Sequence, residues 1–158
     1  MLGSVGAATM FPQWAGAVHS RAPDAPQLLL QIKLGIGEPR SGRDGWRRAQ
    51  VRAGLATGSL LQASVRQGQL EWLVDPASGA VQVVAGMLLV RRDGALIRLR
   101  DRSAHAQAAA FGYPGVCTAP ELFDAAGIAL PAPGPLAGLL DASGLGRGLV
   151  RLRVFAQG

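Results

Sequence analysis

The sequence predicts an all-β protein, folded as a small antiparallel β-barrel. Short apolar segments recur about every eight to twelve residues and are separated by glycine-rich turns, which is the spacing of an antiparallel sandwich or barrel. Several segments alternate apolar and polar residues with the period of two that is typical of strands. The 22 glycines and 10 prolines suit a chain with many turns.

The most informative segment is residues 81–100, which reads VQVVAGMLLVRRDGALIRLR. Asp93-Gly94 lies between two apolar runs, and this dipeptide predicts a type I′ hairpin turn. After the turn, Ile97 and Leu99 share one face of the predicted strand and Arg98 lies on the other. The run before the turn is apolar on both faces, so we expect it to be covered on both sides or closed into a barrel.

Further strands follow from the same alternation, and the last one is predicted to pair with a central or first strand and close the sheet. A Gln67-Gly68 turn is expected to separate two of them. The predicted strands outside the hairpin are Gln27–Gly35, Trp46–Val51, Ser59–Arg66, Leu70–Val74 and Leu149–Phe155.

The chain divides into a disordered N-terminal extension, residues 1–26, and a single barrel domain, residues 27–158. The extension is rich in glycine and alanine and ends in a proline-punctuated linker, with no basic region of the kind that begins a secretory signal. After the hairpin, the alanine-rich stretch from Ser103 to Phe111 predicts a short helical or irregular insertion.

Charge and cysteine content limit the classes of function. The net charge is +6, but the arginines are spread over many predicted strands and aromatic residues are 5%, so nucleic-acid binding is not predicted. The single cysteine, Cys117, allows no disulfide within the chain, which indicates a reducing, cytoplasmic location. No apolar run approaches the length that spans a membrane, so no membrane association is expected.

A series of short motifs resembles a known family. They are Leu70-Glu71-Trp72, the DGALI of Asp93–Ile97, Thr118-Ala119-Pro120 and Leu139-Leu140-Asp141. Their order resembles the uncharacterised bacterial family called domain of unknown function 3237, over residues 28–155, and DGALI is the most specific motif. The resemblance implies a barrel similar to allene oxide cyclase, with a pocket inside it and no assigned biochemical role.

The resemblance also implies site residues, with departures from the family pattern. Glu71-Trp72 stands for the family's Asp-Trp pair, and His105 stands in an Arg-His-Gly-like segment that here reads Ala-His-Ala. Thr118 is what remains of a Phe-Arg-Thr segment, and Asp141 ends a segment that matches Trp-Leu-Asn. Because several polar or aromatic pocket positions are small or aliphatic here, either the pocket takes a more apolar ligand or its chemistry is lost.

The candidate catalytic residues are Glu71 and His105. If Leu70 and Trp72 pack outward, Glu71 points into the barrel, where burial raises the pKa of a carboxyl and fits it for proton transfer. An imidazole at His105 would serve as its acid–base partner. The alternatives are a solvent-facing glutamate and an exposed histidine in a loop.

The candidate ligand-binding residues are Trp72, Arg98, Thr118 and Asp141. An inward Arg98 would bind a carboxylate-bearing ligand, whereas an outward one is an ordinary solvated residue. Cys117 without a base is expected to be a small buried residue rather than a nucleophile. The two histidines give no metal constellation, and no cofactor is predicted.

Three functions remain open. The first is a cofactor-independent isomerase or cyclase that holds an apolar small molecule in a reactive shape, with Glu71 and His105 handling a proton. The second is a lipocalin-like carrier that binds without transforming. The third is a structural subunit whose two-faced strands are buried in a homo-oligomer.

Overall fold

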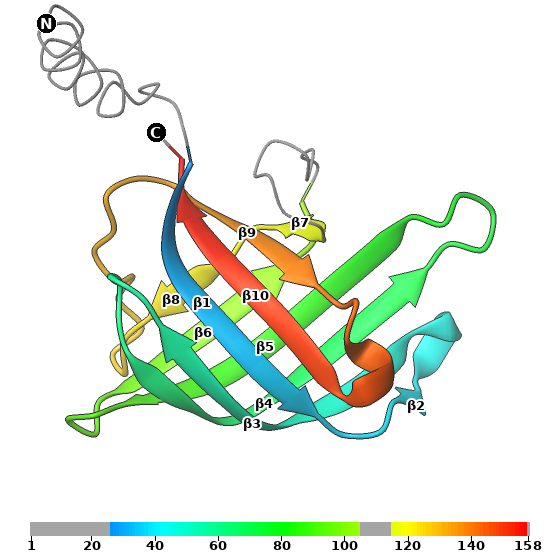
Figure 1. Cartoon of the computed structure of the whole chain (residues 1–158), viewed down its shortest axis with the longest axis horizontal. Coiled ribbons are helices and arrows are strands. Elements are labelled where there is room, and N and C mark those ends of the chain that lie inside the picture. The colour runs from blue at the N-terminus through cyan, green and yellow to red at the C-terminus, as the bar shows by residue number, and fades with distance from the viewer. Residues whose placement is uncertain (1–25, 105–114, 158) are drawn as a thin grey trace, which may run out of the picture.

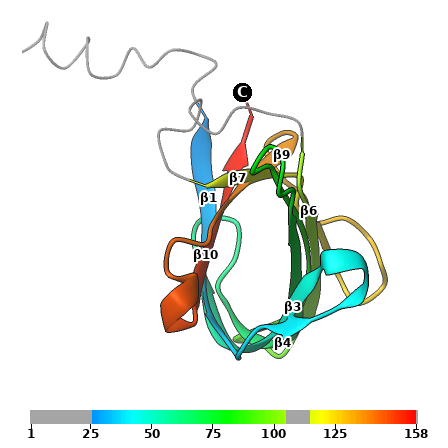
Figure 2. The same ribbon diagram turned by 90° about the vertical axis from the view of Figure 1, so that its right-hand side faces the viewer.

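The computed structural model describes residues 26–104 and 115–157, which form one strongly curled antiparallel sheet (Figures 1 and 2). This all-β, barrel-like architecture confirms the predicted fold class. The strands are β1 (Gln27–Ile36), β2 (Arg40–Ser41), β3 (Arg47–Thr57), β4 (Ala63–Val74), β5 (Val81–Arg91), β6 (Leu96–Arg102), β7 (Val116–Thr118), β8 (Glu121–Phe123), β9 (Leu136–Asp141) and β10 (Leu149–Ala156), with short 3₁₀ helices η1 (Arg43–Gly45) and η3 (Leu145–Arg147).

The strand order is β7-β9-β10-β1-β3-β4-β5-β6-β8, and β2 pairs with β3. The closing strand β10 pairs with the first strand β1, from Gln27 opposite Ala156 to Gly35 opposite Leu149, with one register shift between Leu28 and Leu30. The start of β1 and the end of β10 therefore lie side by side (Figure 1). The prediction that the last strand pairs with a central or first strand is confirmed.

The two ends of the curled sheet meet where β6 approaches β7. Ser103 forms an isolated bridge with Thr118. The backbone N–H of Ala104 donates to the Cys117 carbonyl at 2.8 Å, and the N–H of Ala119 donates to the Arg102 carbonyl at 2.8 Å. These few bonds join β7, the first strand of the sheet order, to β6, its last long strand. The barrel closes between these two strands.

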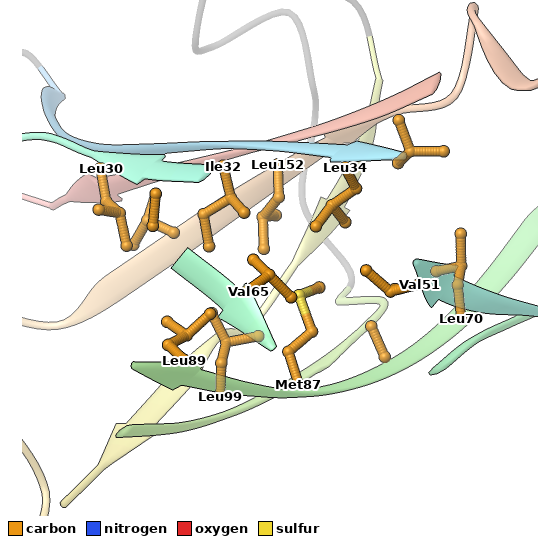
Figure 3. Packing of buried hydrophobic residues seen from close by; sticks show 14 of the residues in the cluster. Leu30, Ile32, Leu34, Val51, Val65, Leu70, Met87, Leu89, Leu99 and Leu152 are labelled. Carbon is orange, nitrogen blue, oxygen red and sulfur yellow. The ribbon is translucent and has the colours of Figure 1, made fainter. Parts of the chain in front are cut away.

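The inside of the barrel is filled by aliphatic side chains, because inner positions alternate with outer ones along every long strand. Leu152 of β10 and Leu89 of β5 are each 0% exposed. Figure 3 shows Val65, Met87 and Leu152, from three strands, with their side chains pointing toward the common centre. The mostly apolar interior that the sequence predicts is therefore a packed core over its middle.

The central hairpin is confirmed, but its turn type is not. Gly94 has φ of 88°, whereas Asp93 has no positive φ, so the turn is not type I′. The N–H of Gly94 donates to the Arg91 carbonyl and the N–H of Arg91 to the Ala95 carbonyl, each at 2.9 Å. This is a three-residue loop with the glycine in the left-handed conformation, the next most common hairpin connection.

The predicted Gln67-Gly68 turn is wrong. The chain continues through it as one strand, β4, with a register shift against β5 between Val65 and Gln67. This bulge adds one residue and changes which face the following side chains take. Val65 points inward before it, and Leu70 points inward after it, although five positions separate them. The bulge therefore decides on which side of the sheet Glu71 lies.

Two sequence predictions lie wholly or mostly outside the described residues. They are the disordered extension and the insertion that begins at Ser103, of which the structure describes only Ser103 and Ala104. Within residues 26–104 and 115–157, the structure has no helix that is long and apolar enough to cross a membrane.

Candidate functional site

Glu71 lies on the outer face of the sheet. Its neighbours Leu70 and Trp72 point inward, so the condition that would aim Glu71 into the barrel is not met. The carboxylate pairs with Arg48, Nη2 to Oε1 at 3.4 Å, and accepts a hydrogen bond from the side-chain amide of Gln69. Its side chain is 30% exposed. The structure thus gives Glu71 the surroundings of a surface ion pair, and its catalytic role stays a prediction.

Trp72 and Thr118 lie on the inner face and belong to one row of cross-strand neighbours. Trp72 is opposite Val83, the N–H of Ser103 donates to the Val83 carbonyl at 2.9 Å, and Ser103 bridges to Thr118. Trp72 is partly buried against the core, and Thr118 is 2% exposed. The structure therefore brings these two predicted ligand-binding residues to the same side of the sheet, with β5 and β6 between them.

The acid inside the barrel is Asp101. It continues the inward series of Ile97 and Leu99 along β6, lies opposite Ala85, and is 2% exposed. The alternation of the hairpin strand already placed Ile97 and Leu99 on one face, and extending it by one step reaches Asp101. The sequence therefore contains the signal for Asp101, whereas the family resemblance implies an acid at Glu71.

The Asp101 carboxyl is an unusual group for such an interior. Within the described residues, neither carboxyl oxygen has a hydrogen-bond partner, and the Thr118 hydroxyl also lacks one. Burial raises the pKa of Asp101 from 3.8 to about 7, while the nearby Thr118 hydroxyl and the Arg102 backbone act in the opposite direction. A carboxyl with such a pKa both donates and accepts a proton near neutral pH.

Thr118 holds its position against Gly138 of β9. The two residues are register partners, and a Cβ at position 138 would collide with Thr118 Oγ1 and lie 3.0 Å from the Cδ of Pro120. The absence of a side chain at Gly138 therefore makes the space that the Thr118 hydroxyl occupies beside Asp101.

We expect Gly138→Ala to lower the free energy of unfolding by about 1–3 kcal/mol, because it overpacks this space. Adding Thr118→Ala removes the colliding oxygen and should restore about 1 kcal/mol, whereas adding Thr118→Ser keeps the oxygen and should restore nothing. Urea denaturation of the single and double variants measures this coupling. Equal recovery with alanine and serine would contradict the packing described here.

Arg98 and Asp141 lie outside the barrel. Arg98 is exposed on the outer face of β6, as the outward alternative for the arginines predicts. Asp141 ends β9 opposite Arg151, and its Oδ1 accepts a hydrogen bond from the Ser143 N–H at 2.9 Å. That bond lowers the pKa of Asp141. The structure does not bring these two residues to Trp72 and Thr118.

Two further residues considered from the sequence are His105 and Cys117. His105 lies outside the described residues. Cys117 is buried with Leu139 and Phe155 in a small second cluster, and burial raises the pKa of its thiol. In the described part of the chain, no three acidic, histidine or cysteine side chains are grouped so that they would hold a metal ion.

Solved structures share this fold. A protein of unknown function from Clostridium acetobutylicum superposes with a TM-score of 0.62 at 15% identity, covering 84% of this chain and 96% of its own. A β-barrel-like protein from Acinetobacter baumannii gives 0.60 at 17% identity, with 89% and 99% covered. An enzyme from Penicillium herquei gives 0.52 at 16% identity, with 85% and 98% covered.

These similarities concern the fold alone, since all three identities are low. No protein-family model matches the chain, and no curated protein matches it. The chain is thus structurally similar to a β-barrel-like protein and to proteins described as of unknown function.

Proposed function

We propose that this protein binds a small, largely apolar molecule at the inner face of β6 and transfers a proton on it with Asp101, as a cofactor-independent isomerase or cyclase. The observation that carries the proposal is the Asp101 carboxyl, which is 2% exposed and has no hydrogen-bond partner for either oxygen among the described residues. Burying such a group without a partner costs several kcal/mol, and the core of the barrel is otherwise built mainly of aliphatic side chains. Carboxyls with strongly raised pKa values are concentrated at functional sites.

The chemistry follows from the Asp101 pKa of about 7. In its ionised form the carboxyl takes a proton from an acidic carbon of the ligand, and the resulting acid returns it to another carbon. Proton and charge balance over the two steps, and no other reactant is consumed. The hydroxyl of Thr118 lies near Asp101 and would donate to an oxygen of the ligand on which negative charge develops.

The apolar part of the ligand would lie against Trp72. Trp72 and Ser103 are both partly exposed, unlike Asp101 and Thr118. This end of the row is therefore where a ligand would reach the interior. The similarity to a fungal protein described as an enzyme supports a catalytic use of this fold, and the order of motifs supports placing the chain as a divergent member of the domain of unknown function 3237 family.

The second candidate is a non-catalytic role, as a carrier or as a subunit of a homo-oligomer. The packed middle of the barrel favours the subunit, since leucine, isoleucine and valine side chains already fill it. Val84, on the outer face of β5, is 48% exposed and would be covered in such an assembly.

The test begins with native mass spectrometry of the purified protein, followed by a thermal-shift screen of apolar carboxylic acids and enones below and above pH 7. We expect at least one compound of the screen to raise Tm. Its affinity should differ between pH values below and above the Asp101 pKa of about 7. The hit is then assayed for proton exchange with deuterated solvent, which reports transfer at carbon without requiring the product to be known.

Asp101→Asn and Glu71→Gln are matched variants, since each removes one carboxylate, inside and outside the barrel respectively. We expect Asp101→Asn to abolish exchange while the ligand still binds, and Glu71→Gln to fold and exchange as the parent does. Binding without exchange in the parent would support a carrier, and loss of exchange in Glu71→Gln alone would return the catalytic role to Glu71.

A further inference from the structure

The outer face of β6 carries a row of arginines. Arg98, Arg100 and Arg102 alternate with the inward residues of the strand, and all three are exposed. In the described part of the chain, the ion pairs Arg48–Glu71 and Arg91–Asp93 involve none of the three, and none of them has a carboxylate within 4.0 Å. This face of the strand therefore presents three arginines without a close ion pair, and the nearest acidic neighbour across the strands is Glu121 of β8, the register partner of Arg100.

A gap in the neighbouring strand lies directly beside this row. Gly86 of β5 is paired with Arg100 on one side and with Gln69 of β4 on the other. A Cβ built on Gly86 would have nothing within 4 Å, so the missing side chain leaves open space between them. The result is an open depression of about 700 Å³ on the outer surface. We call it the Gly86 depression.

The Gly86 depression is lined by groups that suit an anion. Its charged side chains are Arg98 and Arg100, and no carboxylate is among its lining residues. Three amide side chains, Gln50, Gln67 and Gln69, complete its polar lining and supply both donors and acceptors. Guanidinium groups bind carboxylates and phosphates through paired hydrogen bonds, which is the strongest interaction of this kind.

Part of this site is held in place before any ligand arrives. The guanidinium carbon of Arg100 lies 4.8 Å from the centre of the Phe123 ring, a cation–π contact that restricts the movement of this side chain. The Gln69 amide donates to Glu71, which is itself paired with Arg48. Because these side chains are anchored, less entropy is lost when they order around a ligand.

We propose that the Gly86 depression is a binding site for a small organic anion. Its carboxylate or phosphate group lies between Arg98 and Arg100, and its neutral polar part contacts the glutamine amides. The site is on the opposite face of the sheet from the Asp101 carboxyl, so it does not depend on the proton-transfer function proposed above.

The test uses isothermal titration calorimetry at low ionic strength with citrate, inorganic phosphate and a short single-stranded oligonucleotide as probes. We expect citrate or phosphate to bind, and whichever binds more tightly identifies the anionic group that the site prefers. An oligonucleotide that binds more tightly than both, and depends on the same arginines, would overturn the proposal in favour of an extended polyanion. Binding of none of the three probes would also overturn it.

Two variants locate the site, and one controls for charge. Arg98→Gln with Arg100→Gln should weaken binding at least about tenfold, because two charged hydrogen-bond donors are lost. Gly86→Val should abolish binding while Tm stays the same or rises, since valine suits a strand and meets no atoms there. Arg92→Gln removes a charge from the exposed β5–β6 turn and should leave the affinity within about twofold.

Each outcome has a definite meaning. An Arg92→Gln loss equal to that of the Arg98 and Arg100 variant would show that net charge alone attracts the probe, and would overturn the site. Unchanged binding in Gly86→Val would overturn it as well. Because Asp101→Asn leaves this face untouched, it should bind the probe as the parent does, which separates this proposal from the proposed enzymatic function.

Discussion

Asp101→Asn is expected to stabilise the protein above pH 7. It should also remove the fall in the free energy of unfolding that ionisation of Asp101 causes as pH rises. The pKa of Asp101 is raised from 3.8 to about 7 on folding, so between these values the folded state binds more protons than the unfolded state. The free energy of unfolding therefore falls as pH rises through this interval. Each pKa unit corresponds to about 1.4 kcal/mol, so the accumulated penalty approaches about 4 kcal/mol above pH 7.

Asparagine carries no charge at any of these pH values. The variant should therefore match the parent near pH 4 and exceed it by on the order of 2–4 kcal/mol at pH 8. Urea denaturation at several pH values measures this, with Glu71→Gln as the control that removes a carboxylate from the outer face. A parent whose stability does not fall relative to that of Asp101→Asn between pH 4 and 7 would show that Asp101 is not desolvated as the structure indicates. A variant that is more stable but inactive is also the signature of a functional group that is retained at a cost to stability.

Leu152→Ala is expected to lower the free energy of unfolding by about 2–5 kcal/mol, because it leaves a cavity among side chains that are already close-packed. Leu152 is 0% exposed and lies at the centre of the barrel (Figure 3). Urea denaturation measures the loss. Leu149→Ala is the matched control, since Leu149 lies on the same strand, is 53% exposed, and should change stability by less than about 0.5 kcal/mol.

The size of the Leu152→Ala loss also bears on where a ligand binds. A loss well below 1 kcal/mol would mean that the middle of the barrel has spare room, and would move the expected binding site from the Asp101 end toward the centre. A loss in the expected range would support entry at the Trp72 and Ser103 end, because the middle is then too well packed to admit a ligand.

The fold was predictable because local patterns and global topology agree over most of the chain. Alternation identified β1, β6 and β10, and the Asp93-Gly94 turn between two apolar runs identified β5 and the central hairpin, even though the turn type differed. The closing strand was identified from its regular alternation, in which Val150, Leu152 and Val154 share one face. Each of these features depends on residues that are near one another in sequence.

The candidate site was less predictable, and the cause is one inserted residue. Strict alternation from Val65 would place Glu71 on the inner face, because six positions separate them. The bulge at Arg66 and Gln67 shifts that phase by one, so Leu70 and Trp72 turn inward and Glu71 turns outward. Nothing in the sequence distinguishes a bulge at Arg66 and Gln67 from the turn that the adjoining Gln67-Gly68 dipeptide suggested. On β6, which has no such shift, the same alternation leads correctly to Asp101.

The pairing of β1 with β10 determines when folding of the domain can be completed during synthesis. The first strand of the barrel lies between β3 and the last strand, so one of its two neighbours is also the final element of the domain to be synthesised. The closing contact spans nearly the whole domain, and chain entropy must be lost over that length before the contact contributes. Folding is therefore completed only after β10 leaves the ribosome, on the millisecond-to-second scale of non-local β topologies. Until then, the edge of β1 that pairs with β10 has unpaired backbone N–H and C=O groups. The incomplete chain can aggregate with other chains through this exposed edge.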